Sequence, residues 1–292
     1  MLKLEWLEAF VAFAEHTNFT RAAAALHLSQ PALHVQVQKL GEALGVPLYQ
    51  RRGQKLELTA DGRRVAAFGR DLLGRTNDLV AELHAGSQRA PVVLCAGEGA
   101  YLYLVGEGIS AFLASGSAPL SLLTRDREGT LDAVRGGEAH VGVAALDVLP
   151  EDLDVRPLTE VAQVLVVPAA HPLAKKRTIR LPDLAGARLV VAGAERPQRA
   201  LITRALRDAA VPWEVAVEAN GWPLMLRFVE LGVGLAVVNA CCRIPDGLVA
   251  RPIPDLPRQR YHVLRRRGAA AEGPAAQLVE ALVTSVRDRR SK

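Results

Sequence analysis

The chain has 292 residues, of which 50% are hydrophobic and 23% are charged, and its formal net charge is +5 at pH 7. This length predicts two or three domains, and the composition is typical of a globular protein. No apolar run approaches the roughly 20 residues that a membrane span needs. Three cysteines in a chain of this length make no disulfide framework. A membrane protein and a disulfide-stabilised secreted domain are therefore both disfavoured.

The first residues predict an amphipathic helix over residues 3–15. Glu5, Glu8 and Glu15 recur there at helical spacing. Acidic residues at this spacing, without a small-residue cleavage site, are not typical of a signal peptide. We therefore expect a cytoplasmic protein that is not bound to a membrane.

Two more helices are predicted close behind the first. The segment "NFTRAAAALHL", residues 18–28, forms a short helix with Thr20 as a candidate first-turn cap. The segment 29–44 begins with Ser-Gln-Pro, a cap followed by a first-turn proline. Its apolar residues form one stripe, namely Leu33, Val37, Leu40 and Leu44. Two helices joined by so short a turn predict a helix-turn-helix.

The other face of this third helix carries Gln30, His34 and Gln38, and a basic hairpin follows it. In "PLYQRRGQKLELT", residues 47–59, two strand-like runs flank Arg51-Arg52-Gly53-Gln54. Residues 29–64 hold six basic and three acidic side chains. A helix-turn-helix followed by a basic hairpin predicts a winged module. The alternative, a helical bundle whose polar face is merely solvated, leaves the basic hairpin unexplained.

A long helix is predicted over residues 59–86. Its apolar positions recur at alternating intervals of three and four: Val65, Phe68, Leu72, Thr76, Leu79 and Leu83. This pattern, with one polar position, is typical of a two-stranded coiled coil and predicts dimerisation. A helix that packs on its own domain would show the same stripe.

Strands and helices alternate from residue 91 onward. Strands are predicted at 92–96, 120–124, 140–146, 164–168, 188–193, 213–220, 234–242 and 261–267, and helices at 199–210 and 223–232. This order predicts an α/β domain with largely parallel sheets, divided into two lobes. In such sheets a ligand binds beyond the carboxyl ends of the strands.

Motifs of catalysis and of cofactor binding are missing from the sequence. It contains no G-x-S-x-G, P-loop or H-E-x-x-H, and its seven histidines lack the spacing of metal ligands. The segment "AGEGA", residues 96–100, lacks the remaining glycines of a nucleotide fingerprint. We expect no catalytic residue, cofactor or metal. The nine basic and three acidic residues of 258–292 indicate a solvated surface.

Several motifs together resemble the LysR-type transcriptional regulators, nearly from end to end of the chain. They are "FTRAAAALHLSQPAL" (19–33), "LGVPLYQRRGQKLELTADG" (44–62), "GGEAHVGVAAL" (136–146), "HPLA" (171–174) followed by Ile179, Leu181 and "DLAG" (183–186), and "VELGVGLAVV" (229–238). The resemblance implies a winged helix-turn-helix over residues 1–58 and a dimerising linker helix over 59–90. It also implies an effector domain over 91–292, similar to type 2 periplasmic binding proteins, with lobes of 91–161 plus 266–292 and of 162–265.

The resemblance implies a sequence-specific transcriptional regulator and not an enzyme. Its partners would be double-stranded promoter DNA, a small-molecule effector between the two lobes, further copies of itself in a homodimer or homotetramer, and RNA polymerase. A solute-binding protein would need a signal peptide and no winged domain. An enzyme on the same scaffold would need acid, base or cofactor residues converging on the cleft, and the sequence offers no such set.

The resemblance also places the DNA contacts. The helix from Gln30 would be the recognition helix, lying in the major groove with Gln30, Pro31, His34 and Gln36 at family positions. Thr20, Arg21, Arg51 and Arg52 match positions near the phosphates. Here His34 stands where serine is usual, Val35 where a basic residue is usual, and Gly41 where glutamate is common.

The effector cleft would be lined by four loops. By resemblance these loops contribute Gly97, Glu98, Gly99, Ala100, Arg125, Asp126, Gly193, Ala194, Glu195, Asn220, Gly221 and Trp222. Many relatives place serine or threonine in the first loop to hold a carboxylate. Glu98 in that loop favours an amine or guanidine, whereas Arg125 favours an anion, and Glu98 as a solvated loop residue is the other interpretation.

The cysteines Cys95, Cys241 and Cys242 lie in or just after predicted strands. Adjacent cysteines bridge each other only with strain, so all three are interpreted as small apolar packing residues. Peroxide-sensing members of the family use a well-separated pair on one flexible loop. That arrangement is absent here, and a redox role is the minor alternative.

Overall fold

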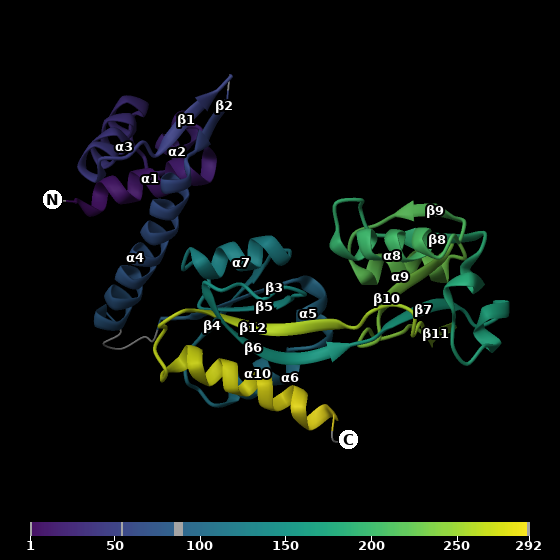
Figure 1. Ribbon diagram of the computed structural model, residues 1–292. Helices are drawn as coiled ribbons and strands as arrows, with labels where there is room; N and C mark the ends of the chain where they lie inside the picture. Colours follow the sequence, from purple (N-terminus) through teal and green to yellow (C-terminus); the bar gives the residue numbers. More distant parts are fainter. Residues whose placement is uncertain (1, 54, 85–89, 291–292) are drawn as a thin grey trace. The chain divides into compact units, whose positions relative to one another are not determined.

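The computed structural model describes residues 2–53, 55–84 and 90–290 (Figure 1). They fall into two compact units, Met1–Pro91 with Asp132–His140, and Val92–Leu131 with Val141–Lys292. The first contains the predicted helix-turn-helix and the long helix. The second contains two five-stranded mixed sheets, which confirms the α/β class with an N-terminal helix-turn-helix and a linker helix.

Three helices and a hairpin precede the long helix. The helices are α1 (Leu4–His16), α2 (Phe19–Ala25) and α3 (Gln30–Leu44), and the hairpin is β1 (Tyr49–Arg52) with β2 (Lys55–Leu58). Helix α4 (Ala60–His84) follows. The stripe Leu33, Val37 and Leu40 is buried in one core with Phe10 and Phe13 of α1. A Cβ on Gly69 of α4 would lie 2.6 Å from Val11 Cγ2, so a glycine permits α1 and α4 to pack closely.

The sequence of the caps explains where these helices begin and end. Ser29 Oγ accepts the Ala32 N–H at 3.3 Å, and Gly45 ends α3 in the left-handed region at φ +69°. Asn18, and not Thr20, caps α2, because its Oδ1 accepts the N–H groups of Thr20 at 2.9 Å and of Arg21 at 3.1 Å. Thr20 therefore lies inside the first turn with its hydroxyl available to other groups.

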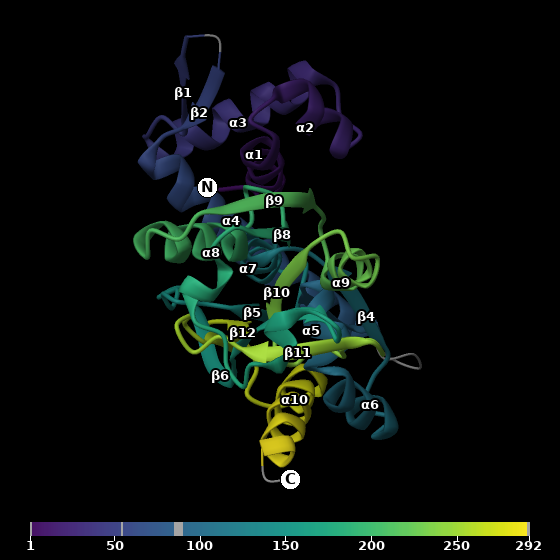
Figure 2. The ribbon, with the colours of Figure 1, turned by 90° about the vertical axis from the view of Figure 1, so that its right-hand side faces the viewer.

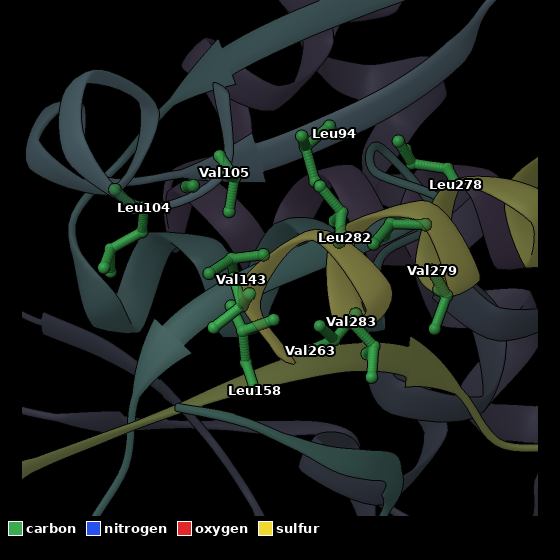
Figure 3. Close-up of a cluster of buried hydrophobic side chains, with 14 of the residues drawn as sticks. Leu94, Leu104, Val105, Val143, Leu158, Val263, Leu278, Val279, Leu282 and Val283 are labelled. Atoms are coloured by element: carbon green, nitrogen blue, oxygen red, sulfur yellow. The ribbon is translucent and has the colours of Figure 1, made fainter. Parts of the chain in front are cut away.

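The first lobe is built on the sheet β4-β3-β5-β12-β6. Its strands are β3 (Val92–Ala96), β4 (Leu120–Thr124), β5 (Val141–Ala145), β6 (Leu153–Val161) and β12 (Gln259–Arg266). Its helices are α5 (Glu98–Tyr103), α6 (Gly106–Ala114) and α10 (Pro274–Arg290), and helix α7 (Arg127–Arg135) is divided between the two compact units at Asp132. Figure 3 shows its core, where Leu278 and Leu282 of α10 meet strand residues such as Leu94 and Val263.

The second lobe is built on the sheet β11-β7-β10-β8-β9. Its strands are β7 (Gln163–Pro168), β8 (Ala187–Val191), β9 (Trp213–Glu218), β10 (Leu235–Asn239) and β11 (Leu248–Pro252). Two short 3-10 helices, Pro172–Lys175 and Leu181–Leu184, lie between β7 and β8. Helices α8 (Pro197–Asp208) and α9 (Trp222–Glu230) cover opposite faces of the sheet (Figure 2). Successive strand residues alternate between the two cores, as with Val164 and Leu165.

Three details differ from expectation. Strands β6 and β11 were not predicted, and four of the eight strand pairings in the two sheets are antiparallel, so "largely parallel" is wrong. In addition, β12 pairs with β5 and β6, which places residues 259–265 in the first lobe and not in the second. These differences have one cause. The chain crosses between the lobes in extended segments, and these segments pair with the sheets as antiparallel strands.

Candidate DNA-binding surface and effector cleft

The exposed face of α3 carries Gln30, Pro31 and His34 close together. Since a helix turns through 3.6 residues, these three side chains occupy about a quarter of its circumference. Gln36 is half-buried and lies about 120° around the axis from Gln30. The structure therefore brings three of the four predicted base-reading residues onto one face and leaves Gln36 on another.

His34 is held by aromatic side chains. Its ring centroid lies 4.9 Å from that of Phe19, and its Nε2 lies 3.3 Å from the hydroxyl of Tyr49. Burial raises the pKa of Tyr49, so this phenol stays protonated and can donate or accept at neutral pH. The imidazole is therefore exposed, and its contacts with α2 and β1 fix its orientation.

The four residues predicted to approach phosphates are all exposed. Thr20 Oγ1 lies 3.5 Å from Gln30 Oε1, which connects the start of α2 to the start of α3. Arg51 Nε donates to the Gly53 carbonyl at 3.2 Å, and Arg52 Nη1 lies 3.8 Å from Glu57 Oε2. Both contacts lie within the hairpin, and the hairpin reaches α3 through the contact between Tyr49 and His34.

The sequence interpretation missed Tyr49 and Asn18 in this unit. Asn18 had a readable signal, since asparagine before an alanine-rich helix is a preferred cap. Tyr49 had no such signal, because its contact with His34 spans 15 positions and depends on how the hairpin folds back.

Two of the predicted cleft loops meet across the lobes. A Cβ on Gly99, in α5 of the first lobe, would lie 2.6 Å from Cε3 of Trp222 in the second lobe, so that ring packs directly on the glycine. A Cβ on Gly221 would lie 3.2 Å from Glu98 Oε2, and Gly221 itself has φ +91°. The indole Nε1 of Trp222 donates to Gln198 Oε1 at 3.2 Å, which fixes the ring.

A second contact across the lobes joins Arg196 and Asp126. Arg196 Nη1 lies 3.6 Å from Asp126 Oδ2, and its Nε lies 3.4 Å from Glu195 Oε1. The two side chains of the cross-lobe pair are 40% and 55% exposed, so the pair contributes at most about 1 kcal/mol. The pair matters mainly for the arrangement of the lobes, because it joins the loop after β4 to the start of α8.

The remaining predicted cleft residues differ from one another in burial and in hydrogen bonding. Ala100 is 4% exposed and belongs to the first lobe's core, so it does not face a ligand. Within the second lobe, Gly193 N–H donates to Asn220 Oδ1 at 3.2 Å. Arg125 N–H donates to the Ala96 carbonyl at 3.2 Å, and the side chains of Arg125 and Ala194 are exposed. Gly97 precedes α5 as its N-terminal flanking residue.

Three residues at or beside these contacts between the lobes were not predicted: Arg196, Gln198 and Tyr103. Arg196 and Gln198 flank Pro197 at the start of α8, and the proline marks a helix start that could have directed attention to them. Tyr103 belongs to the first lobe, yet its ring centroid lies 6.1 Å from that of Trp222 in the second. Burial raises the pKa of Tyr103, with smaller contributions from Cys242 and Glu98.

Among the residues that the structure describes, no group of three or more histidine, cysteine or acidic side chains is arranged to hold a metal ion. Within residues 2–53, 55–84 and 90–290, no helix combines the length and apolarity needed to cross a bilayer.

Both units match bacterial regulator families. Residues 4–63 match the family described as "Bacterial regulatory helix-turn-helix protein, lysR family", and residues 85–287 match "LysR substrate binding domain". The chain belongs to the LysR-type transcriptional regulators. It is therefore a DNA-binding transcriptional regulator with an effector-binding domain, and the family is not enzymatic.

Individual relatives agree with this assignment. The "Uncharacterized HTH-type transcriptional regulator YbhD" of Escherichia coli K12 is 26% identical, with 97% of this chain and 92% of that protein covered. The "Small neutral protease regulatory protein" of Streptomyces coelicolor is 34% identical, with 65% and 60% covered.

Solved structures share the whole architecture. A full-length variant of OxyR from Pseudomonas aeruginosa has a TM-score of 0.67 at 25% identity, with 98% of this chain and 95% of that chain covered. CbnR in complex with its target DNA has a TM-score of 0.53 at 23% identity, with 98% and 100% covered, and shows the shared fold.

Proposed function

We propose that this regulator binds a two-part operator as a dimer, with one α3 in each of two successive major grooves. The observation that carries this proposal is the exposed face of Gln30, Pro31 and His34 beside a hairpin that bears Arg51 and Arg52. Amide and imidazole groups suit base edges, whereas guanidinium groups supply affinity for phosphates without sequence information. Thr20 and Arg21 would add contacts to the backbone at the start of α2.

Dimerisation through α4 is the second part of the proposal. On this helix the Phe68 side chain is 59% exposed and Leu79 is 54% exposed, although both occupy the apolar repeat. Phe68 and Leu72 also line a groove of about 550 Å³, whose other apolar walls come from α1 and α3. An apolar groove continuous with an exposed apolar stripe favours a second copy of α4 as the occupant. The side chain of Leu83, the last predicted seam residue, lies outside those the structure describes.

The effector would act at the contacts that join the lobes. A small molecule in the cleft would compete for the space where Trp222 packs on Gly99, and for the charges of Arg196 and Asp126. If it binds one arrangement of the lobes better than another, it shifts the population toward that arrangement. Gly97, Glu98, Arg125, Gly193, Ala194, Glu195, Asn220 and Gly221 would complete the lining.

The cellular setting follows from this role. A protein that acts on promoters works beside the chromosome, so we place it in the bacterial cytoplasm. There it would meet RNA polymerase at the promoter, and association of two dimers would give a homotetramer.

Selection from a randomised duplex library tests the operator proposal. Purified full-length protein should enrich sequences with two related half-sites whose centres lie about one helical turn, 10–10.5 base pairs, or a multiple of it apart. Enrichment of a single unpaired half-site, or of no motif, would contradict it. His34→Ala in the same selection should change the enriched bases inside the half-site while the spacing stays the same.

A further inference from the structure

Helix α4 begins directly after the hairpin, and a single threonine joins the two. Thr59 lies between the last residue of β2 and the first residue of α4. Its Oγ1 donates to the Pro47 carbonyl at 2.7 Å and accepts the Gly62 N–H at 2.8 Å. Its backbone N–H donates to the Leu48 carbonyl at 3.1 Å. Thr59 therefore caps α4 and also holds the first turn of this helix to the segment before β1.

Gly62 brings the first turn of α4 into close contact with the same segment. This glycine is buried, and a Cβ on it would lie 1.8 Å from the Leu48 carbonyl oxygen. Because that oxygen belongs to the main chain, any larger residue would force the two backbones apart. Arg63, the next residue, donates from Nη1 to the Leu58 carbonyl at 2.8 Å. The first turn of α4 is therefore fixed to the chain on both sides of the hairpin.

Helix α4 is held at a second place, where it packs on α1. Ala66 is buried in the core that also contains Leu7 of α1 and the apolar stripe of α3. A Cβ on Gly69 would lie 2.6 Å from Val11 Cγ2 and 3.0 Å from Leu7 Cδ1. Gly69 lies about two turns beyond Gly62. A helix held at two such places cannot swing or rotate against α3 without breaking one of these contacts.

We propose that Thr59 and Gly62 are positioning residues that set the distance between the two half-sites of the operator. This inference rests on the proposed dimer, in which two copies of α4 associate. The dimer contact fixes one α4 relative to the other, and the junction at Thr59 and Gly62 fixes each α4 relative to its own α3. Residues on α3 choose the bases of a half-site, whereas these two residues choose the separation of the half-sites.

The geometry of DNA makes this separation a sharp requirement. One additional base pair moves a half-site along the duplex and also turns it by about 34–36° around the axis. A rigidly held pair of α3 helices meets that change with lost base contacts. A loosened junction lets the second α3 follow its half-site, so the preference for one separation becomes weaker while the preferred bases stay the same.

Binding of the full-length protein to a series of duplexes tests the inference. Each duplex carries the two half-sites selected by the wild type, with their separation changed one base pair at a time. Wild-type protein should bind the selected separation about tenfold more tightly than its neighbours, because a displaced half-site loses at least one base contact. Thr59→Val keeps the shape of the side chain, removes both hydroxyl hydrogen bonds and should reduce this ratio to about threefold or less. Gly62→Ala should reduce it similarly, and Thr178→Val, at an exposed threonine of the second lobe, is the matched control.

Two further readouts separate this role from a general loss of structure. For Thr59→Val, base substitutions within one half-site should have the same effect as for wild type, and sedimentation velocity should show the same dimer, since the apolar repeat of α4 begins beyond the junction, at Val65. If Gly62→Ala does not fold, Thr59→Val carries the test alone.

The inference is overturned if folded, dimeric Thr59→Val keeps the wild-type ratio between separations, or if it changes the preferred bases within a half-site. An unchanged ratio on a paired operator overturns this inference and leaves the operator proposal intact. A wild type that prefers no separation overturns both.

Discussion

The hydroxyl of Tyr49 lies 3.3 Å from Nε2 of His34, which joins strand β1 directly to helix α3. The hairpin thus does more than carry charge, because it also orients a side chain on the face proposed to meet the bases. Some residues orient a base-reading side chain, some read bases, and some anchor the protein to phosphates. Substitutions in each group should therefore have different effects on DNA binding.

Tyr49→Phe should change operator preference more than overall affinity. It keeps the ring that packs on Phe13 and Phe19 and removes only the hydroxyl that fixes His34. A single base contact is worth about 1 kcal/mol, so discrimination between the operator and a variant half-site should fall by roughly fivefold. Competition binding with two duplexes measures this ratio, and His34→Ala should produce a similar change. An equal loss of affinity for both duplexes would mean that His34 contacts phosphates and not bases.

Arg51→Ala should weaken binding to every DNA alike. The loss of one phosphate contact reduces the slope of log affinity against log salt by about 1 for each recognition unit that contacts DNA. Titration at several salt concentrations, on operator and on random DNA, gives both slopes. Arg204→Ala is a suitable control, because this exposed arginine of α8 pairs with Asp208 at 3.5 Å far along the chain from the hairpin. An unchanged slope for Arg51→Ala would contradict the anchoring role.

Phe68→Glu should convert the dimer into a monomer. Burial of one phenylalanine is worth about 1.5–3 kcal/mol, and a dimer loses two copies, so its dissociation constant should rise by at least about 100-fold. Sedimentation velocity across a concentration series measures the shift. Ala67→Glu is the control, because residue 67 is exposed on the same helix but lies outside the apolar repeat. If both variants stay dimeric, α4 is not the principal interface.

Gly99→Ala should destabilise the effector domain and separate the lobes at Trp222. Its new Cβ would lie 2.6 Å from Cε3 of the indole, so the ring must move, at a cost of about 1–3 kcal/mol. Urea unfolding and tryptophan fluorescence report the two effects. Gly97→Ala provides the contrast, since a Cβ there meets only the Arg125 carbonyl oxygen at 3.8 Å. Equal stability of the two variants would mean that Trp222 does not pack on residue 99 in solution.

The second lobe should lose stability in acid. Backbone N–H groups, of Arg180 for Asp183 and of Leu181 for Asp255, hold the pKa of each carboxylate below its usual 3.8, with help from Lys176 and Arg180 respectively. A pKa lowered by folding gives stability that is present above 3.8 and is lost as the pH falls through the folded value. Asp183→Asn should therefore show a shallower loss of urea resistance below pH 4 than wild type. An equally steep loss of urea resistance would mean that Asp183 does not cause the loss of stability in acid.

Much of the fold could be predicted because its signals are local. The stripe of Leu33, Val37 and Leu40 needs only the period of a helix, and Gly53 between two short runs marks a hairpin. Strand β6 was missed because Pro157 and several polar residues interrupt its apolar pattern, and β11 ends in Arg251 and Pro252. Strand direction depends on where the chain crosses between lobes, which no local pattern records.

The candidate sites follow the same rule. The exposed positions of α3 could be predicted from helical spacing, except Gln36, whose half-burial depends on neighbouring elements. The contact of Trp222 with Gly99 and the pair of Arg196 with Asp126 arise only when two lobes meet. Family resemblance supplied the loops, but not which of their side chains touch.

Footprinting on the fragment upstream of the protein's own gene tests the central claim most directly. In the presence of competitor DNA and over a range of salt concentrations, the wild-type protein should protect two half-sites about one helical turn, or a multiple of it, apart. Phe68→Glu should lose this paired protection at the same protein concentration. Protection of one isolated half-site, or no preference over random DNA at any salt concentration, would contradict the claim that a dimer reads this operator through α3.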